Sequence, residues 1–173
     1  MKYLFVLMFC FSGILNAQNS NQFAFRNTDL SDRIHNKDTF YEGEVNRKFP
    51  YKVTFESVLK NTKYPEKYLV KGISEYEGKF SKFEGEIVFK ESFEVKNRSY
   101  SLLNFGDFNF SQINEEGVTE KFVGKVRMEM LKDVSIENYS ITFKGTLRQS
   151  NSDTTEIWFG NLFHNNFDKV IFR

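Results

Sequence analysis

A five-residue pattern recurs along this chain: an aromatic residue, any residue, a glycine, a polar residue and an apolar residue. Side chains alternate between the two faces of a strand, so the aromatic residue and the glycine lie on the same face. A glycine weakens a strand unless a neighbouring aromatic ring covers the gap or the strand bends sharply there. The pattern occurs at 41–45, 76–80, 83–87, 122–126, 143–147 and 158–162. Unless these matches arise by chance in a Phe- and Gly-rich chain, they predict a sheet that bends repeatedly, as in a small barrel.

Alternation of apolar and polar residues predicts strands along most of the chain. The most regular alternation, over 139–148, places Tyr139, Ile141 and Phe143 on one face and Ser140 and Thr142 on the other. The resulting series favours an all-β, antiparallel up-and-down barrel of about eight strands within a single domain at 39–173, with a two-sheet β-sandwich as the alternative. The expected strands are 39–45, 51–60, 67–80, 83–95, 99–110, 119–131, 139–148 and 155–163, with 170–172 as a terminal strand that closes the sheet against the first.

The first 17 residues have the organisation of a secretory signal peptide, with one early lysine, an apolar run and Ala17 at the expected cleavage point. The apolar run is shorter than the roughly 20 residues of a membrane span. Bulky Phe9 stands before Cys10, where a lipoprotein signal has a small residue, which argues against a lipid anchor at Cys10. We therefore expect export to the periplasm or beyond. A polar, flexible leader is expected at 18–38, in which 29–36 can form one or two helical turns with Leu30 and Ile34 facing inward.

Removal of the signal peptide takes away the only cysteine and leaves equal numbers of basic and acidic residues. An exported domain without disulfides depends on its core for stability. Balanced, interleaved charge argues against nucleic-acid binding, which favours a strongly basic face. The Asn- and Lys-rich composition is typical of a bacterial protein.

The chain carries no recognisable catalytic or cofactor-binding motif. Its two histidines, His35 and His164, have no second ligand at metal spacing. Pairs such as Glu84 and Glu86 alternate with apolar residues and lie among lysines, which indicates a solvated exterior. We expect a non-enzymatic protein without a cofactor or a metal.

Four residues are candidates for contact with a ligand. Glu91 and Asp107 each interrupt an apolar face, and an inward polar group in a barrel can orient a ligand. The alternative is that either residue lies at the rim of the barrel or beside a bulge. Trp158 and Phe163 belong to a segment that is apolar on both faces. Both aromatic side chains are expected to line the mouth of the barrel and contact a ligand there. The alternative for Trp158 is that its ring fills the core and closes the barrel.

The strand number, the length and the aromatic-x-Gly units between Tyr41 and Leu162 resemble lipocalin-like and avidin-like exported barrels. The stretch 68–89 also looks like uncharacterised secreted bacterial proteins of this size. The lipocalin G-x-W opening is absent, so no binding residue is carried over. The resemblance implies a ligand cavity. A hollow interior favours binding of a small apolar or amphipathic ligand, whereas a packed interior favours a surface module that contacts a protein or glycan.

Overall fold

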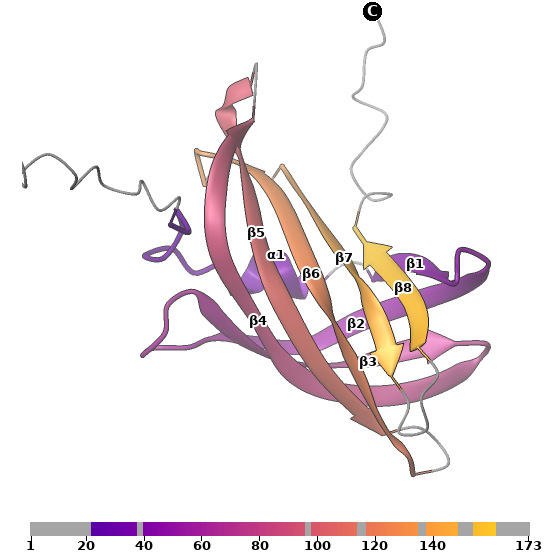
Figure 1. Ribbon diagram of the computed structural model, residues 1–173. Coiled ribbons are helices and arrows are strands. Elements are labelled where there is room, and N and C mark those ends of the chain that lie inside the picture. The colour runs from indigo at the N-terminus through magenta and orange to yellow at the C-terminus, as the bar shows by residue number, and fades with distance from the viewer. Residues whose placement is uncertain are drawn as a thin grey trace, which may run out of the picture.

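The protein is a closed barrel of eight antiparallel strands, in which each strand pairs with the next and β8 pairs with β1 (Figure 1). The computed structural model describes residues 22–37, 40–95, 98–113, 117–134, 138–148 and 154–161. The up-and-down barrel expected from the alternation is confirmed, and this architecture is compatible with that of lipocalin-like and avidin-like barrels. The elements are α1 (Ser31–His35), β1 (Tyr41–Val45), β2 (Phe49–Lys60), β3 (Lys67–Tyr76), β4 (Lys79–Val95), β5 (Arg98–Ile113), β6 (Thr119–Leu131), β7 (Tyr139–Arg148) and β8 (Thr154–Gly160).

The barrel closes between β1 and β8, where Val45 pairs with Ile157 and Glu42 with Gly160. The segment 170–172, expected to close the sheet, lies outside the described residues, and so do 1–21. Closure by β8 leaves neither β1 nor β8 as an open edge.

Two kinds of glycine occur in the recurring pattern. Gly124 and Gly145 lie directly opposite each other on β6 and β7, and a Cβ on Gly124 would come within 2.2 Å of the Lys144 carbonyl oxygen. Here the absent side chain allows the close approach that a bent sheet requires. Gly78 is different: Glu77 and Gly78 have φ values of 51° and 75° and form the two-residue turn between β3 and β4. The expected strand 67–80 therefore ends at Tyr76.

Register shifts occur within β2, within β4 and at the end of β4 between Glu94 and Val95, and the two that lie within the strands reverse their inward and outward faces. One lies between Phe55 and Ser57 on β2, and the other lies between Phe89 and Glu91 on β4. An extra residue in one strand moves all later side chains to the opposite face. Leu59, expected to face inward with Phe55, is consequently 64% exposed, and Val58 takes the inward position.

The middle of the barrel is filled with aromatic rings. Phe55 contacts Tyr41, Phe110 and Phe143 edge-on or tilted, and the Phe143 ring stacks on Phe159. All five side chains are buried. Edge-to-face and offset rings pack at high density and stabilise one arrangement. These rings, all from described residues, occupy the space that a ligand would need in the middle of the barrel.

The N-terminal segment packs against one end of the barrel. Phe23 stacks on Phe89 of β4 with ring centroids 4.9 Å apart, and the Tyr41 hydroxyl donates to the Ile34 carbonyl at 2.8 Å. Leu30 and Ile34 are fully buried, as expected for helical turns within 29–36. The described part of the expected leader, 22–37, thus contributes Phe23, Phe25, Leu30 and Ile34 to the core. α1 is too short to span a membrane, and the described residues contain no longer helix that could do so.

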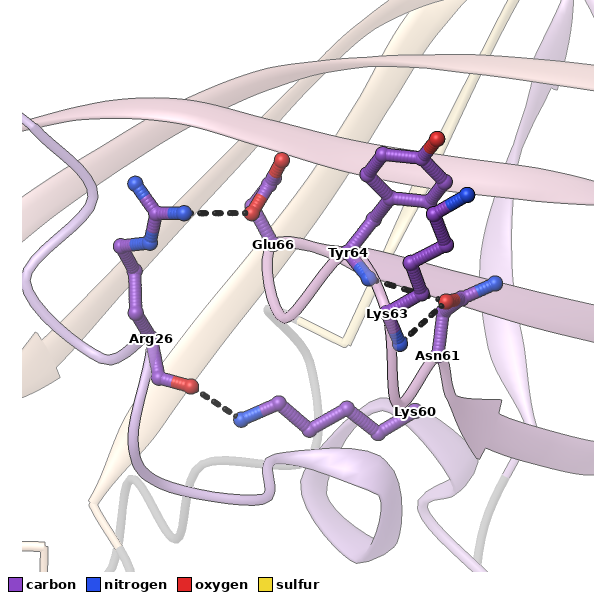
Figure 2. A network of polar contacts seen from close by, with 6 residues as sticks. All are labelled: Arg26, Lys60, Asn61, Lys63, Tyr64 and Glu66. Atoms are coloured by element: carbon purple, nitrogen blue, oxygen red, sulfur yellow. Dashed lines mark hydrogen bonds and ion pairs between the residues drawn. The ribbon is translucent and has the colours of Figure 1, made fainter.

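Polar contacts attach this segment to the turn between β2 and β3. The Lys60 ammonium donates to the carbonyls of Arg26 and Thr28 at 2.5 and 2.7 Å, and Arg26 pairs with Glu66 at 3.3 Å. Figure 2 shows that Lys60 and Glu66, on either side of the turn, both contact Arg26. Within the turn, Asn61 Oδ1 accepts hydrogen bonds from the backbone N–H groups of Lys63 and Tyr64. This end of the barrel is therefore covered, and the opposite end remains as a place for a site.

Candidate functional site

The opposite end of the barrel, as far as the structure describes it, contains a cavity of about 710 Å³ that is open to solvent. It lies at the β1–β2 and β3–β4 hairpins, which point to the right in Figure 1, whereas the β2–β3 hairpin points to the left. We call this cavity the cup. All eight strands contribute to it. Its lining residues are Val45, Asn46, Tyr51, Ser74, Tyr76, Glu77, Lys79, Ser81, Gln112, Glu120, Leu147, Thr155 and Ile157.

One wall of the cup, formed by β3, β5 and β6, is a buried hydrogen-bonded chain. The Ser74 hydroxyl donates to Gln112 Oε1 at 3.1 Å, and Gln112 Nε2 donates to Glu120 Oε2 at 2.6 Å. Glu120 is 4% exposed, and the other two residues are also buried. Buried polar groups are costly unless they are hydrogen-bonded, and a satisfied network holds its members in one geometry. The chain therefore fixes the orientation of the Gln112 amide.

Tyr51 of β2 extends this chain. Burial raises the pKa of the Tyr51 hydroxyl to about 12, the hydrogen bond with Ser74 opposes that shift, and the nearby Glu120 carboxyl adds to it. The Ser74 hydroxyl has a further acceptor in the Ser81 carbonyl, 3.4 Å away. Ser74 and Gln112 thus link the Tyr51 hydroxyl to the Glu120 carboxyl across the wall.

The opposite wall is apolar and is formed by β1, β7 and β8. Val45 and Ile157 are buried and pair across the β1–β8 closure, and Leu147 is partly buried against the core. Below this wall the next inward residue of β8 is Phe159, whose ring lies 5.9 Å from that of Tyr51. The cup therefore has a polar side and an apolar side above an aromatic floor.

Trp158 lies on the outer surface of the barrel. It is partly buried, its neighbours Ile157 and Phe159 face inward, and it pairs with Glu44 and Lys144 on the adjacent strands. It lines a shallow outer depression of about 260 Å³ beside β1 and β2. Trp158 does not line the cup, and Phe163 lies outside the described residues.

Glu91 and Asp107 also lie away from the cup. Glu91 is exposed beyond the bulge of β4 and forms an isolated bridge with Gln22. Asp107 shares a face with Phe105, as the alternation indicates, but this face is the outer one. Its carboxylate forms ion pairs with Lys90 and with Lys125, and these hydrogen bonds lower the pKa of Asp107 below its usual value. The structure does not bring these residues together with Trp158.

Sequence reasoning missed the polar wall, although a signal was present. Gln112 comes two residues after inward Phe110, and Glu120 comes two residues before inward Phe122. Both therefore interrupt an inward apolar face, as Glu91 and Asp107 were expected to do. The expected strand 99–110 stopped short of Gln112, whereas β5 extends to Ile113.

The described residues contain no group of three or more His, Cys, Asp or Glu side chains that could hold a metal ion. What the cup offers instead is a buried carboxyl, neutral hydrogen-bonding groups and an apolar wall. This set can hold a small molecule in one orientation. No known protein family, curated protein or solved structure matches this chain.

Proposed function

We propose that the protein binds a small amphipathic ligand in the cup, without catalysing its conversion, and that it does so after export to the periplasm or beyond. The observation that carries this proposal is the division of one cavity into a polar wall at Ser74, Gln112 and Glu120 and an apolar wall at Val45, Leu147 and Ile157. A ligand with a polar end and an apolar body satisfies both walls at once. Its size is limited by the cup, whose volume lies within the range of about 300–1,000 Å³ that is usual for ligand sites.

The packed middle of the barrel limits how such a ligand binds. The rings of Phe55, Phe110 and Phe143 fill the centre, so the ligand enters from the open end and rests on the aromatic floor. Binding at the mouth requires no rearrangement of the core, and a site that is already formed costs little ordering on binding.

A neutral solvatochromic dye such as Nile red tests the proposal. The wild-type protein is expected to bind it at one saturable site with enhanced fluorescence. Leu147→Trp fills the apolar side of the cup and should abolish binding. Phe80→Ser removes an exposed apolar side chain from the outer surface and should leave binding unchanged. Unaltered binding by a folded Leu147→Trp variant, or its loss in Phe80→Ser, would overturn the proposal.

The outer surface supports a second candidate function, contact with a protein or glycan partner. Phe80 and Ile113 are each 62% exposed and line an outer depression of about 680 Å³ that extends over β2 to β6. Exposed apolar groups beside a concave surface are typical of interaction sites. Loss of dye binding in Phe80→Ser, but not in Leu147→Trp, would favour this second function.

A further inference from the structure

We propose that the outer depression beside Trp158 is a carbohydrate site, which takes one neutral pyranose ring with equatorial hydroxyl groups. The depression is formed by Trp158 of β8 together with residues of the β1–β2 hairpin. It is separate from the cup, and it does not depend on the function proposed for the cup.

Trp158 is a large aromatic side chain in charged surroundings. The outward residues next to it are Glu44 on β1, Lys144 on β7 and Glu156 two positions earlier on β8. Lys144 is ion-paired with Glu156 at 3.0 Å, and the depression opens on the other side of Trp158, toward β1 and β2. Tryptophan is enriched where proteins contact partners, because its ring is apolar and its N–H is a hydrogen-bond donor. The position of Trp158 therefore favours contact with a ligand.

The register of β1 with its neighbours places a second flat group beside the indole. Glu44 pairs with Trp158 on one side and with Pro50 on the other, so the two rings flank this carboxylate in one row across the sheet. In the next row, Glu42 pairs with Lys52. Paired side chains on one face of a sheet have Cβ atoms about 4.5–5.5 Å apart. Apolar ring faces and charged groups are thus combined in one small site.

The charged groups of the depression favour a neutral ligand with several hydroxyl groups. The carboxylates of Glu42 and Glu44 offer acceptors, whereas the ammonium groups of Lys48 and Lys52 offer donors. Because the formal charges of these four groups cancel, a charged ligand would meet like charge from one of the two pairs. A hydroxyl group both donates and accepts hydrogen bonds, so it can satisfy either pair.

The indole face and the size of the depression define the ligand further. The face of an aromatic ring is negative. A pyranose with equatorial hydroxyl groups has only weakly positive C–H groups on its two faces, so one face can stack on the indole while the hydroxyl groups at its edge meet the charged residues. The depression has a volume of about 260 Å³, below the range of about 300–1,000 Å³ that is usual for ligand sites. This volume suits a single sugar ring, either free or within a glycan chain.

Trp158 is the only tryptophan of the chain, so tryptophan fluorescence reports on this site alone. The purified protein is titrated with methyl β-glucoside, as a free sugar, and with cellotetraose, as a chain of the same ring. At least one of them should change the tryptophan emission in a saturable manner. Sorbitol, which has hydroxyl groups but no ring face, and choline, which is a cation, should leave the emission unchanged.

Substitutions test the contacts by isothermal titration calorimetry with the sugar that binds. Trp158→Ala should lower the affinity about tenfold or more, because the stacking face is lost. Tyr100→Ala, which removes an exposed aromatic ring elsewhere, should leave the affinity unchanged. Glu44→Gln replaces a charge-assisted hydrogen bond by a neutral one and should lower the affinity about threefold. Glu91→Gln, the matched change at an exposed glutamate of β4, should have no effect.

Saturable binding of either sugar that is weakened in Trp158→Ala would support the carbohydrate site, and the two probes distinguish a free sugar from a chain. Lack of response to both sugars, an equal response to sorbitol, or tighter binding of choline would overturn it. If Trp158→Ala does not fold, the emission of the wild-type protein decides alone. Nile red should still bind in the cup of folded Trp158→Ala, so the failure of one proposal is distinguishable from the failure of the other.

Discussion

The rings of Phe143 and Phe159 stack at the centre of the barrel, with centroids 4.7 Å apart and planes inclined by 19°. The two residues are paired on neighbouring strands, β7 and β8, and both are fully buried. Phe159 also contacts Tyr51, so the same stack that fills the barrel forms the floor of the cup. Stability and site geometry are therefore coupled through this pair.

Phe143→Ala should destabilise the protein strongly. Its ring contacts Tyr41, Phe55 and Phe159, and removal of a buried phenylalanine leaves a cavity that costs about 3–5 kcal/mol of unfolding free energy. Urea denaturation followed by circular dichroism measures this loss. The control Phe80→Ala, at a 62% exposed position, should change stability by no more than about 0.5 kcal/mol. Similar losses for both variants would contradict the packed interior.

Gly124→Ala should cost about 1–3 kcal/mol, because the added methyl group meets the backbone of β7 and cannot be accommodated by a side-chain rotation. Thermal denaturation measures the effect. Gly78→Asn is the control: nothing lies within 4 Å of a Cβ at this turn, and asparagine tolerates its positive φ. A neutral Gly124→Ala substitution would show that the sheet does not need the close approach there.

Alkaline pH should destabilise the protein through Tyr51. Its pKa is near 10 in the unfolded chain and about 12 in the folded protein, so the unfolded state loses its proton first. The stabilisation is fully present below pH 10, falls as the pH rises and is lost above about pH 12, a change of about 2–3 kcal/mol. Urea denaturation at a series of pH values measures the slope.

Tyr51→Phe should flatten this part of the profile, although it also removes the hydrogen bond to Ser74 at neutral pH. Tyr100→Phe serves as the control, since its side chain is 61% exposed and is not transferred out of water on folding. A profile of the Tyr51→Phe variant as steep as that of the wild type would exclude Tyr51 as the titrating group. Tyr68, whose pKa burial also raises to about 12, would then be the next residue to replace.

Asp107→Asn should have a small effect that depends on pH and salt. The ion pairs with Lys90 and Lys125 lower the pKa of Asp107, so their stabilisation is present above the usual pKa near 4 and is lost as the pH falls through the lower folded value. Because the pairs are partly exposed, we expect a loss of about 0.2–1 kcal/mol at pH 7 that shrinks in high salt. Denaturation of the two proteins at pH 7 and at pH 2 measures it. A difference that persists at pH 2 would point to lost packing instead of lost charge.

Phe23→Ala should destabilise the covered end of the barrel. The ring stacks on Phe89 and is buried, so its loss should cost about 3–5 kcal/mol if the N-terminal segment belongs to the core. Hydrogen exchange in 22–35 should increase together with this loss. Ligand binding in the cup should be unaffected, because the cup lies at the opposite end.

The sequence determined the local structure and the fold class. Strict alternation, as in 139–148, depends only on neighbouring residues, and the in-strand glycines such as Gly124 and Gly145 indicate the bending that a closed sheet requires. These signals predicted eight antiparallel strands and a barrel. They also suggested helical turns with Leu30 and Ile34 inward.

The tertiary structure decided which residues meet. A bulge moves every later side chain of its strand to the other face. Because β4 has a bulge after Phe89, Glu91 faces outward and is exposed. The cup unites Ser74, Gln112 and Glu120 from three strands, and only the register between those strands brings them within hydrogen-bonding distance. Alternation defines two faces for each strand, but closure of the sheet decides which face becomes the interior and which end of the barrel stays open.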